Sequence, residues 1–218
     1  MVHNLGETNS IFNQFIAEIR DVKVQGDMLR FRRNLERIGA LMAYEISKDL
    51  DYEITDIQTP LGVAKVPILQ SNIVLATILR AGLPFHQGML NVFDKAESAF
   101  ISAYRKHNKD GSFKIKLEYM AKPNLKDKIL ILADPMLATG ASMHLTYKAI
   151  IDEVKPKFTY LVAVIASAEG VEYVKKNFSK SEVSIWVGAI DDELTAQAYI
   201  VPGLGDAGDL AYGKKEDK

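Results

Sequence analysis

The residues best suited to chemistry follow a short apolar run, residues 129–133, and read Asp134-Pro-Met-Leu-Ala-Thr-Gly-Ala-Ser142. Small residues between a strand and a helix let backbone N–H groups point into a shared hollow, and the helix N-terminus adds about half a positive charge. Thr139 and Ser142 add hydroxyl donors. The pattern predicts a cradle for a phosphate monoester, with Asp134 accepting hydrogen bonds from ribose hydroxyls. The alternative is a strand–helix turn capped by Thr139 or Ser142.

Two nucleotide-binding motifs are excluded. No G-x-x-x-x-G-K-[ST] occurs, so the loop is not one that binds nucleoside triphosphates. A G-x-G-x-x-G match is present at residues 203–208, but Pro202 separates it from any apolar strand. Only ten residues follow Gly208, too few for the helix, the second strand and the ribose-binding acid of a dinucleotide site.

Apolar strands alternating with helices must position this loop. Strands are expected at residues 73–79, 98–104, 129–133, 158–166 and 183–188, and helices at 83–92, 140–154 and 169–176. This alternation indicates a parallel sheet covered on both faces, with ligands at the carboxyl ends of its strands. The segments after Leu79, Tyr104, Ala133 and Ile190 are therefore the expected site. Helices at 9–20 and 28–48 and an antiparallel hairpin at 52–67 precede this core.

Composition narrows the class of protein. The chain has 218 residues, 48% of them hydrophobic and 25% charged, and a net charge of −1. One α/β domain is expected, and a protein that mainly coats nucleic acid or an anionic membrane is not. The absence of cysteine excludes disulfides and thiolate zinc sites. No apolar run reaches the ~20 residues of a membrane span, and no signal peptide is recognisable, so we expect a cytoplasmic protein.

Charge is unevenly distributed along the chain. Residues 105–128 contain eight Lys or Arg and three Asp or Glu, whereas residues 191–209 contain five acids and no Lys or Arg. Both segments follow predicted strands, so they could face a polyanionic ligand and its metal. Solvated loops with a chance bias are the alternative. For the acidic residues Asp191, Asp192 and Glu193, we expect a solvated turn rather than a metal site.

Four segments, in chain order, resemble the uracil phosphoribosyltransferases, a branch of the type I phosphoribosyltransferase family. The loop at residues 134–142 resembles the family's loop for phosphoribosyl pyrophosphate (PRPP). Ile78-Leu-Arg80-Ala-Gly82 and Tyr104-Arg105 resemble its two arginine segments. Tyr199-Ile-Val-Pro-Gly-Leu-Gly-Asp-Ala-Gly-Asp209 resembles its uracil-binding stretch, and the likeness covers nearly the whole chain.

The resemblance implies the type I phosphoribosyltransferase fold in a single domain, residues 1–218. Residues 1–70 would form N-terminal helices and a hairpin hood, 71–190 the PRPP-binding core, and 191–213 the uracil-binding segment. The implied reaction is uracil + PRPP → UMP + pyrophosphate, in pyrimidine salvage. The residues implied to bind PRPP are Arg80, Arg105, Asp134, Pro135, Met136, Leu137, Ala138, Thr139, Gly140, Ala141, Ser142 and Asp206.

The resemblance also assigns roles within the site. Arg80 and Arg105 would hold the pyrophosphate, because guanidinium groups bind oxygens bidentately. Backbone groups of Ile200, Gly205 and Ala207, with Asp206, would read uracil. Mg²⁺ is the implied cofactor, held mainly by PRPP oxygens and by Asp206, directly or through water. Arg105 and Asp206 are the candidate catalytic residues, and no convincing general base is found.

Some features depart from the family or leave alternatives open. Ala141 stands where the family often has glycine, a position at which a helix start tolerates a methyl group. Residues 106–121 lack the family's usual loop sequence and are expected to form a hairpin flap over PRPP. A homodimer or homotetramer is implied, and regulation by GTP is undetermined. The other hypotheses are an RNA-binding regulator with this fold, a salvage enzyme for another base, and a catalytically silent homologue.

Overall fold

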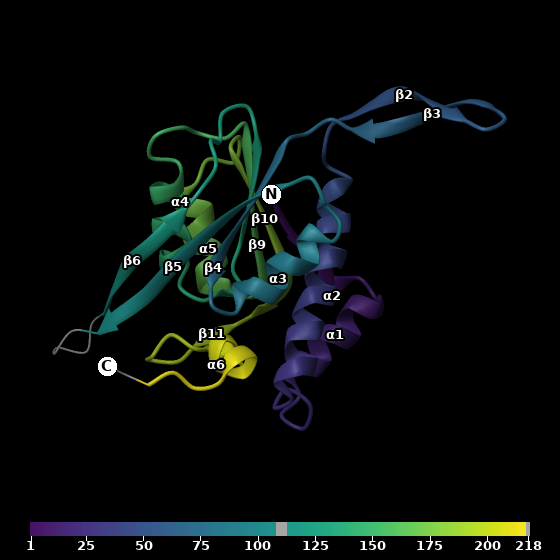
Figure 1. The fold of residues 1–218 in the computed structure, drawn as a ribbon. Helices are drawn as coiled ribbons and strands as arrows, with labels where there is room; N and C mark the ends of the chain where they lie inside the picture. Colours follow the sequence, from purple (N-terminus) through teal and green to yellow (C-terminus); the bar gives the residue numbers. More distant parts are fainter. Residues whose placement is uncertain (108–112, 217–218) are drawn as a thin grey trace.

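The computed structural model describes the backbone of residues 1–107 and 113–216, and side chains outside residues 103–117. Its central sheet is built from β1 (Val2–Asn4), β4 (Ile73–Leu79), β5 (Glu97–His107), β6 (Phe113–Ala121), β7 (Ile129–Ala133), β8 (Met136–Leu137), β9 (Phe158–Ser167) and β10 (Val183–Asp191). The order across the sheet is β1-β10-β9-β7-β4-β5-β6, with β8 beside β9 (Figure 1). All neighbours run parallel except β5 and β6. The predicted α/β fold with a mostly parallel sheet is confirmed.

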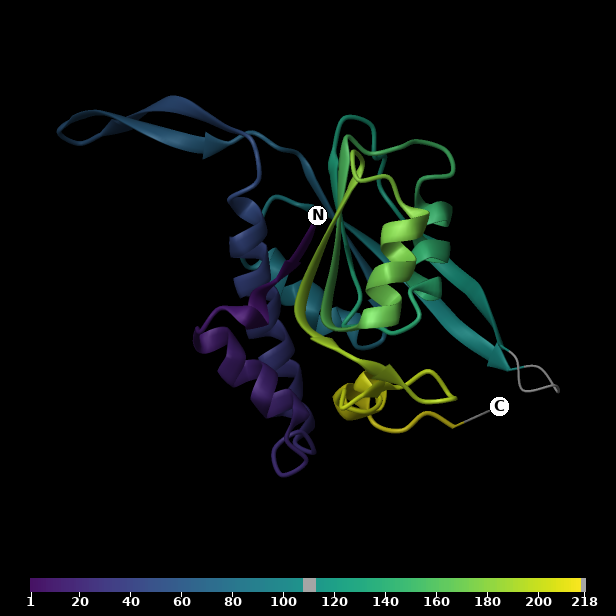
Figure 2. The ribbon, with the colours of Figure 1, turned by 180° about the vertical axis from the view of Figure 1, so that it is seen from behind.

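Helices cover both faces of this sheet (Figures 1 and 2). On one face lie α1 (Ile11–Arg20), α2 (Met28–Ser47) and α3 (Gly82–Leu90), and on the other lie α4 (Ala141–Ile150) and α5 (Ala168–Asn177). Successive strand residues point to opposite faces. Leu75 and Ile131 accordingly pack beneath α1–α3, whereas Val74 and Leu130 pack beneath α4 and α5. Burial on both faces explains why these strands read as continuous apolar runs.

Local sequence signals set the ends of the N-terminal helices. Ser10 is the N-cap of α1, and its side chain accepts a hydrogen bond from Phe12 N at 3.3 Å. Asp27 caps α2 in the same way, accepting from Arg30 N at 3.0 Å. Both predicted helices are thus confirmed to within a few residues. Within the described part of the chain, no helix is long and apolar enough to cross a membrane.

The antiparallel hairpin predicted for residues 52–67 is also confirmed, as β2 (Tyr52–Thr59) and β3 (Gly62–Leu69). It forms a two-stranded sheet of its own and extends away from the central sheet (Figure 1). Large apolar side chains on it are exposed, including Ile54 at 67% and Leu61 at 100%. Two-stranded hairpins are at best marginally stable alone in water, so this one needs a covering surface.

Several boundaries differ from the prediction. Helix α4 ends at Ile150 rather than at residue 154, because Asp152 and Glu153 oppose the helix dipole and Pro156 follows. Strand β10 continues to Asp191, because its pairing with β9 continues to Ser167. Strand β1, helix α6 (Ala207–Tyr212) and the short pair β11 (Glu193–Leu194) and β12 (Ile200–Val201) were not predicted. All these unpredicted elements are too short to carry a periodic pattern.

Candidate active site

The loop of residues 134–142 lies at the carboxyl edge of the sheet, directly after β7. Asp134 N donates to Val162 O at 3.0 Å, and the Asp134 carboxylate accepts from Met136 N at 3.2 Å. Pro135 O accepts hydrogen bonds from the backbone of β9 at Val164 and Ile165. The start of the loop is therefore fixed by the core strand beside it, with Asp134 half-buried at the edge.

The far side of the loop is held by the start of α5. Ser167 Oγ donates to Ala138 O at 2.6 Å and accepts from Gly170 N at 2.8 Å, and both bonds are buried. A Cβ at Gly170 would lie 2.2 Å from Ala138 O and 2.8 Å from Leu137 O. Only glycine therefore lets α5 approach the loop this closely. The loop backbone is buttressed from behind, which preorganises it for a ligand in front.

Gly140 forms the turn from the loop into α4. Its φ is +77°, a left-handed conformation that favours glycine, and a Cβ there would lie 2.8 Å from Tyr173 Cδ1. Gly140 is the N-cap residue, and no side chain caps it; Thr139 Oγ1 accepts only a 3.4 Å bond from Ala141 N. Thr139 therefore contacts the helix start only through this long bond, and Gly140 itself offers no side-chain cap. Ala141 is the first residue of α4, the tolerant position that was expected.

Behind this turn, His144 and Tyr173 pair across α4 and α5. His144 Nδ1 lies 3.0 Å from the Tyr173 hydroxyl, and the two rings meet edge to face. Burial and, to a smaller degree, Lys148 lower the pKa of His144. Tyr173 of this pair packs against the position of Gly140, so it supports the turn at the end of the loop.

Arg80 follows β4 and connects this edge to the C-terminal segment. Its Nη2 lies 2.6 Å from Asp209 Oδ1, and its Nη1 donates to Gly213 O at 3.1 Å. The Arg80 side chain is 37% exposed, which leaves part of it open to a ligand. Nearby, Thr77 Oγ1 donates to Ala133 O at 3.4 Å, and a Cβ at Gly82 would lie 2.1 Å from that hydroxyl oxygen. Close packing against Thr77 therefore requires glycine at position 82.

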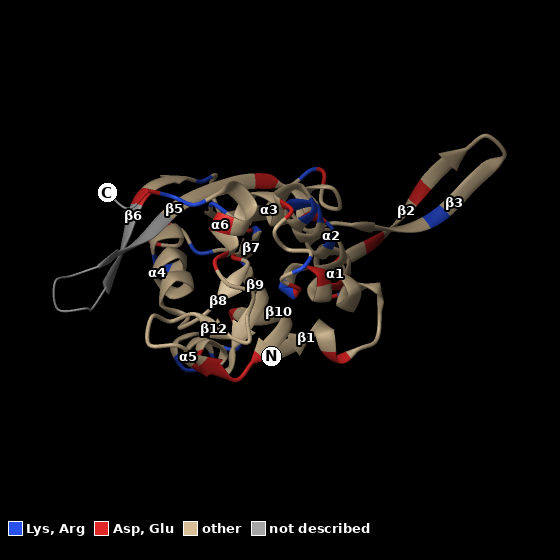
Figure 3. Ribbon diagram, turned by 90° about the horizontal axis from the view of Figure 1, so that it is seen from below, with Lys and Arg blue, Asp and Glu red and all other residues tan. Residues whose placement is uncertain are grey.

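The C-terminal segment turns back over the same edge. Ile200 pairs with Leu194 in the β11–β12 ladder, Gly203 has φ +54° and Gly205 has φ +93°. Asp206 is the N-cap of α6 and accepts from Asp209 N at 2.9 Å; Ala207 is the buried first residue of the helix. Figure 3 looks at the molecule from this side and shows α6 among the strand ends.

The turn after β4 and the C-terminal segment meet at Arg80. A Cβ on Gly208 would lie 3.1 Å from Arg80 Nη2 and 3.2 Å from Asp206 Oδ1. Arg80 and Asp206 therefore flank the same glycine at the start of α6. A cationic and an anionic side chain thus lie at the same helix start. Tyr199, at the start of this segment, is 47% exposed and does not belong to the core.

Arg105 was expected just after a strand, and this position is wrong. It lies inside β5, opposite Ile115 of β6, because β5 outlasts its pairing with β4, which ends at Leu79 and Ser102. Its side chain is outside the described residues. The predicted hairpin at residues 106–121 is present as the β5–β6 pair, and residues 108–112 are outside the described residues.

The acidic turn at residues 191–193 also needs a correction. Asp191 is not solvated: it is 7% exposed and forms a bidentate ion pair with Arg20 of α1, both N···O distances being 2.8 Å. Asp192 and Glu193 are exposed, as expected. Sequence reasoning missed Arg20 because its partner lies 171 residues away.

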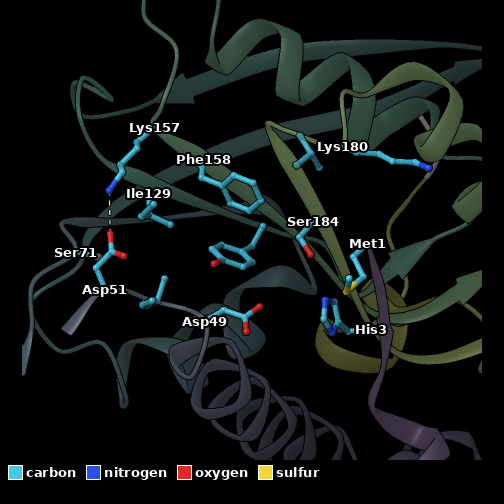
Figure 4. A pocket seen from close by; sticks show the side chains of 13 residues that line it. Met1, His3, Asp49, Asp51, Ser71, Ile129, Lys157, Phe158, Lys180 and Ser184 are labelled. Atoms are coloured by element: carbon cyan, nitrogen blue, oxygen red, sulfur yellow. Dashed lines mark hydrogen bonds and ion pairs between the residues drawn. The ribbon is translucent and has the colours of Figure 1, made fainter. Parts of the chain in front are cut away.

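A cavity of about 470 Å³ lies at the opposite, amino edge of the sheet (Figure 4). Ile129, Phe158 and Val183, each at the start of a strand, help to line it, and Lys157 pairs there with Asp51 at 2.9 Å. Parallel sheets of this kind bind substrates at the carboxyl edge. We therefore place the candidate active site at the loop and not in this cavity.

Comparison with known proteins agrees with this geometry. The family model "Uracil phosphoribosyltransferase" matches residues 7–214. A uracil phosphoribosyltransferase from Porphyromonas gingivalis is 52% identical over 98% of this chain and 99% of its own length. One from Pyrococcus furiosus is 38% identical over 95% of this chain and 88% of its own length.

Solved structures are similar as well. A protein from Aquifex aeolicus, 32% identical, superimposes with a TM-score of 0.85 over 98% of both chains. A hypoxanthine phosphoribosyltransferase from Staphylococcus aureus shares the fold, with a TM-score of 0.51 and 12% identity over 86% of this chain and 84% of that chain. The expected type I phosphoribosyltransferase fold is thereby confirmed. By sequence, by fold and by the match across residues 7–214, this chain belongs to the uracil phosphoribosyltransferase family.

Proposed function

We propose that the chain transfers the phosphoribosyl group of PRPP to uracil, forming UMP and pyrophosphate. The bond from uracil N1 to ribose C1′ forms, the bond from C1′ to the pyrophosphate oxygen breaks, and N1 loses its proton. The observation that carries the proposal is the contact of Arg80, in the turn after β4, with Asp209 of the uracil-like segment, in a chain of this family. We infer that residues 1–218 act as one domain, with the core at 71–190 and the uracil segment at 191–213.

The loop from Asp134 to Ser142 is proposed to hold the 5′-phosphate and the ribose. Its support is the uncapped N-terminus of α4, whose first N–H groups suit a phosphate. The bonds that Ser167 makes to Ala138 O and from Gly170 N keep the loop in place without a ligand. A loop that is already ordered spends less binding energy on reorganisation.

Arg80 and Arg105 are proposed to hold the pyrophosphate. Charge stabilisation of the leaving group and positioning of N1 against C1′ would then supply most of the catalysis. We expect an oxocarbenium-like transition state, by analogy with glycoside chemistry. Asp206 is the nearest candidate for accepting the N1 proton. Its primary proposed role is contact with PRPP or with the metal ion.

Mg²⁺ fits the oxygen donors of this edge. Among the described residues, no group of three or more His, Asp and Glu could cage a metal. This suits an ion that takes most of its ligands from phosphate oxygens and water, with Asp206 binding directly or through water. When bound, the ion would neutralise charge on the pyrophosphate.

Uracil would be read by backbone groups. Ile200, Gly205 and Ala207 belong to a segment in which Gly203 and Gly205 have positive φ, which lets N–H and C=O groups face a flat base. Cytosine would place like groups against this edge, and a buried mismatch of that kind carries a large penalty. The segment thus supports selectivity for uracil.

The test is PRPP- and Mg²⁺-dependent UMP formation, with uracil, cytosine, hypoxanthine and orotate compared. Turnover of uracil alone is expected, and Arg105→Ala should lower kcat/KM for PRPP about 100-fold. Arg33→Ala is the matched control, because Arg33 is 62% exposed on α2. Asp206→Asn should lower activity about tenfold while keeping the helix cap, since Asn caps as well as Asp. Asp192→Asn is its control. No turnover of any base by folded protein that binds PRPP would refute the proposal.

We also infer a homo-oligomer in which the β2–β3 hairpin lies on a second copy of the chain. The exposed apolar side chains of the hairpin support this, notably Ile54, Leu61 and Val63. Ile54→Lys should shift the mass measured by sedimentation toward the monomer, whereas Lys65→Gln on the same hairpin should not. A wild-type monomer at micromolar concentration would contradict the inference.

A further inference from the structure

The buried Asp191 carboxylate, at the end of β10, binds two different groups. Its two oxygens accept hydrogen bonds from Nη1 and Nη2 of Arg20, each at 2.8 Å. Oδ2 also accepts the backbone N–H of Gly203 at 2.9 Å, in a buried bond. The carboxylate therefore joins the last residue of α1 to the turn that follows β12.

Arg20 holds the other side of the same residue. Its Nη1 donates to Gly203 O at 3.0 Å, so both the N–H and the C=O of Gly203 are bound by one ion pair. Gln25 Nε2 donates to Leu204 O at 3.3 Å and to the carbonyls of Ile19 and Arg20 at 3.0 Å each. Two successive residues of the turn are thus anchored to the end of α1.

Gly203 occupies a conformation that leaves little freedom. Its φ is +54°, and a Cβ would lie 2.1 Å from Ile200 O. On either side lie the positions expected to read the base: Ile200 before it, and Gly205 and Ala207 after it. The ladder holding Ile200 has only two residue pairs, and a Cβ at Gly205 would meet nothing within 4 Å. The side chains of Ile200, Leu204 and Ala207 pack into the core, whereas the peptide group of Gly203 is held by the ion pair.

Stability alone does not explain why this buried pair is charged. Replacing a buried ion pair by apolar side chains is often neutral or stabilising. An ion pair of fixed fork geometry, by contrast, sets the position and orientation of the peptide groups it binds. Backbone groups that read a base need that placement, because an error of about 1 Å can cost 100-fold in rate.

We propose that Arg20 and Asp191 are positioning residues for base recognition: they hold Gly203 and thereby the backbone of residues 200–207 against uracil. They act through the turn and do not touch the reacting atoms. The inference rests on the proposed function, because it takes uracil as the ligand of this segment. It goes further by assigning base affinity to two side chains outside residues 200–207.

The test compares Arg20→Lys with Arg30→Lys. Arg30 forms a similar bidentate pair with Glu18 of α1, at 2.9 and 3.0 Å, but has no contact with the turn among the described residues. Arg20→Lys keeps the charge and loses the fork. It should raise the KM for uracil about tenfold and leave the KM for PRPP within about twofold. Arg30→Lys should change neither, and Asp191→Asn should resemble Arg20→Lys.

Amide hydrogen exchange gives a readout that does not need turnover. Arg20→Lys should speed exchange across residues 200–207 in the intact protein, and Arg30→Lys should not. Gln25→Ala provides a milder second variant if the Arg20 variants fold poorly, with a smaller effect of the same sign. Exchange and KM for uracil that are unchanged in Arg20→Lys, or equal rises in both KM values, overturn the inference.

The same measurements distinguish a failure of the proposed function from a failure of the positioning role. Wild-type protein that forms no UMP refutes the proposed function. In that case, faster exchange in Arg20→Lys would show that the ion pair of Arg20 and Asp191 holds the turn. The assignment of that turn to uracil would nevertheless be refuted together with the function. Wild-type protein that turns over uracil, with Arg20→Lys behaving as Arg30→Lys, refutes the positioning role alone.

Discussion

Gly170→Ala tests the claim that α5 supports the PRPP loop by close contact. Gly170 lies in the first turn of α5, and its N–H donates to Ser167 Oγ. A helix-propensity argument alone predicts that alanine stabilises this position by about 1 kcal/mol. The contact argument predicts the opposite, because the new methyl would lie 2.2 Å from Ala138 O.

The magnitudes decide the sign. Ordinary van der Waals contact begins near 3.4 Å, so the loop carbonyl at Ala138 must move by roughly 1 Å. Overpacking of this kind costs about 1–3 kcal/mol. The movement would also stretch the 2.6 Å bond from Ser167 Oγ to Ala138 O, for about 1 kcal/mol more. After the propensity gain, the net loss is about 2 kcal/mol, or a fall in Tm of about 4–8 °C.

The assay combines urea unfolding with steady-state kinetics. Displacement of the loop should raise the KM for PRPP about tenfold or more, with the KM for uracil changed far less. Gly26→Ala is the control, because a Cβ there meets nothing within 4 Å. It should change stability by no more than about 0.5 kcal/mol. A Gly170→Ala protein that is more stable and keeps the wild-type KM for PRPP would show that the loop is not held from behind.

Three further predictions follow from individual contacts. Gly140→Ala forces an alanine into left-handed backbone beside Tyr173, and should lower the unfolding free energy by at least about 1–2 kcal/mol and weaken PRPP binding in calorimetry. Burial lowers the pKa of His86, so the unfolded chain takes up a proton near pH ~6.5 before the folded protein does. Stability is then complete above that pH and falls below it; the drop in urea-unfolding free energy from pH ~7.5 to ~5.5 should be smaller in His86→Gln, and an equal drop would contradict this. Asp209→Asn should change stability by less than about 1 kcal/mol, since its ion pair with Arg80 is partly exposed, and a larger loss in thermal unfolding would argue otherwise.

The sequence predicted the fold where burial leaves a continuous apolar run. Strands at 73–79 and 129–133 agree with β4 and β7 residue for residue, because both faces of these strands are covered. The loop after β7 was identified for a related reason: its small residues are required by close contacts such as those at Gly140. In both cases the physical constraint acts on neighbours in the chain.

Long-range pairing could not be predicted in the same way. Asp191 looks solvated in sequence because two other acids follow it, and nothing nearby indicates Arg20 as its partner. The position of Arg105 failed for a comparable reason: β5 continues beyond its last pair with β4, at Ser102, because its other edge stays paired with β6 to His107, and no local pattern encodes this. What was missed depends on which segments meet in space.

Arg80 contacts Asp209 in α6 and the carbonyl of Gly213 beyond it, and it is also the residue expected to receive pyrophosphate. Any ligand that changes the position of this guanidinium therefore changes the free energy of the helix that follows the base-reading turn. Thermodynamic linkage makes such an effect reciprocal: the factor by which one substrate alters the affinity of the other must be the same in both directions. A single side chain can in this way make the affinities of the two halves of the site dependent on each other.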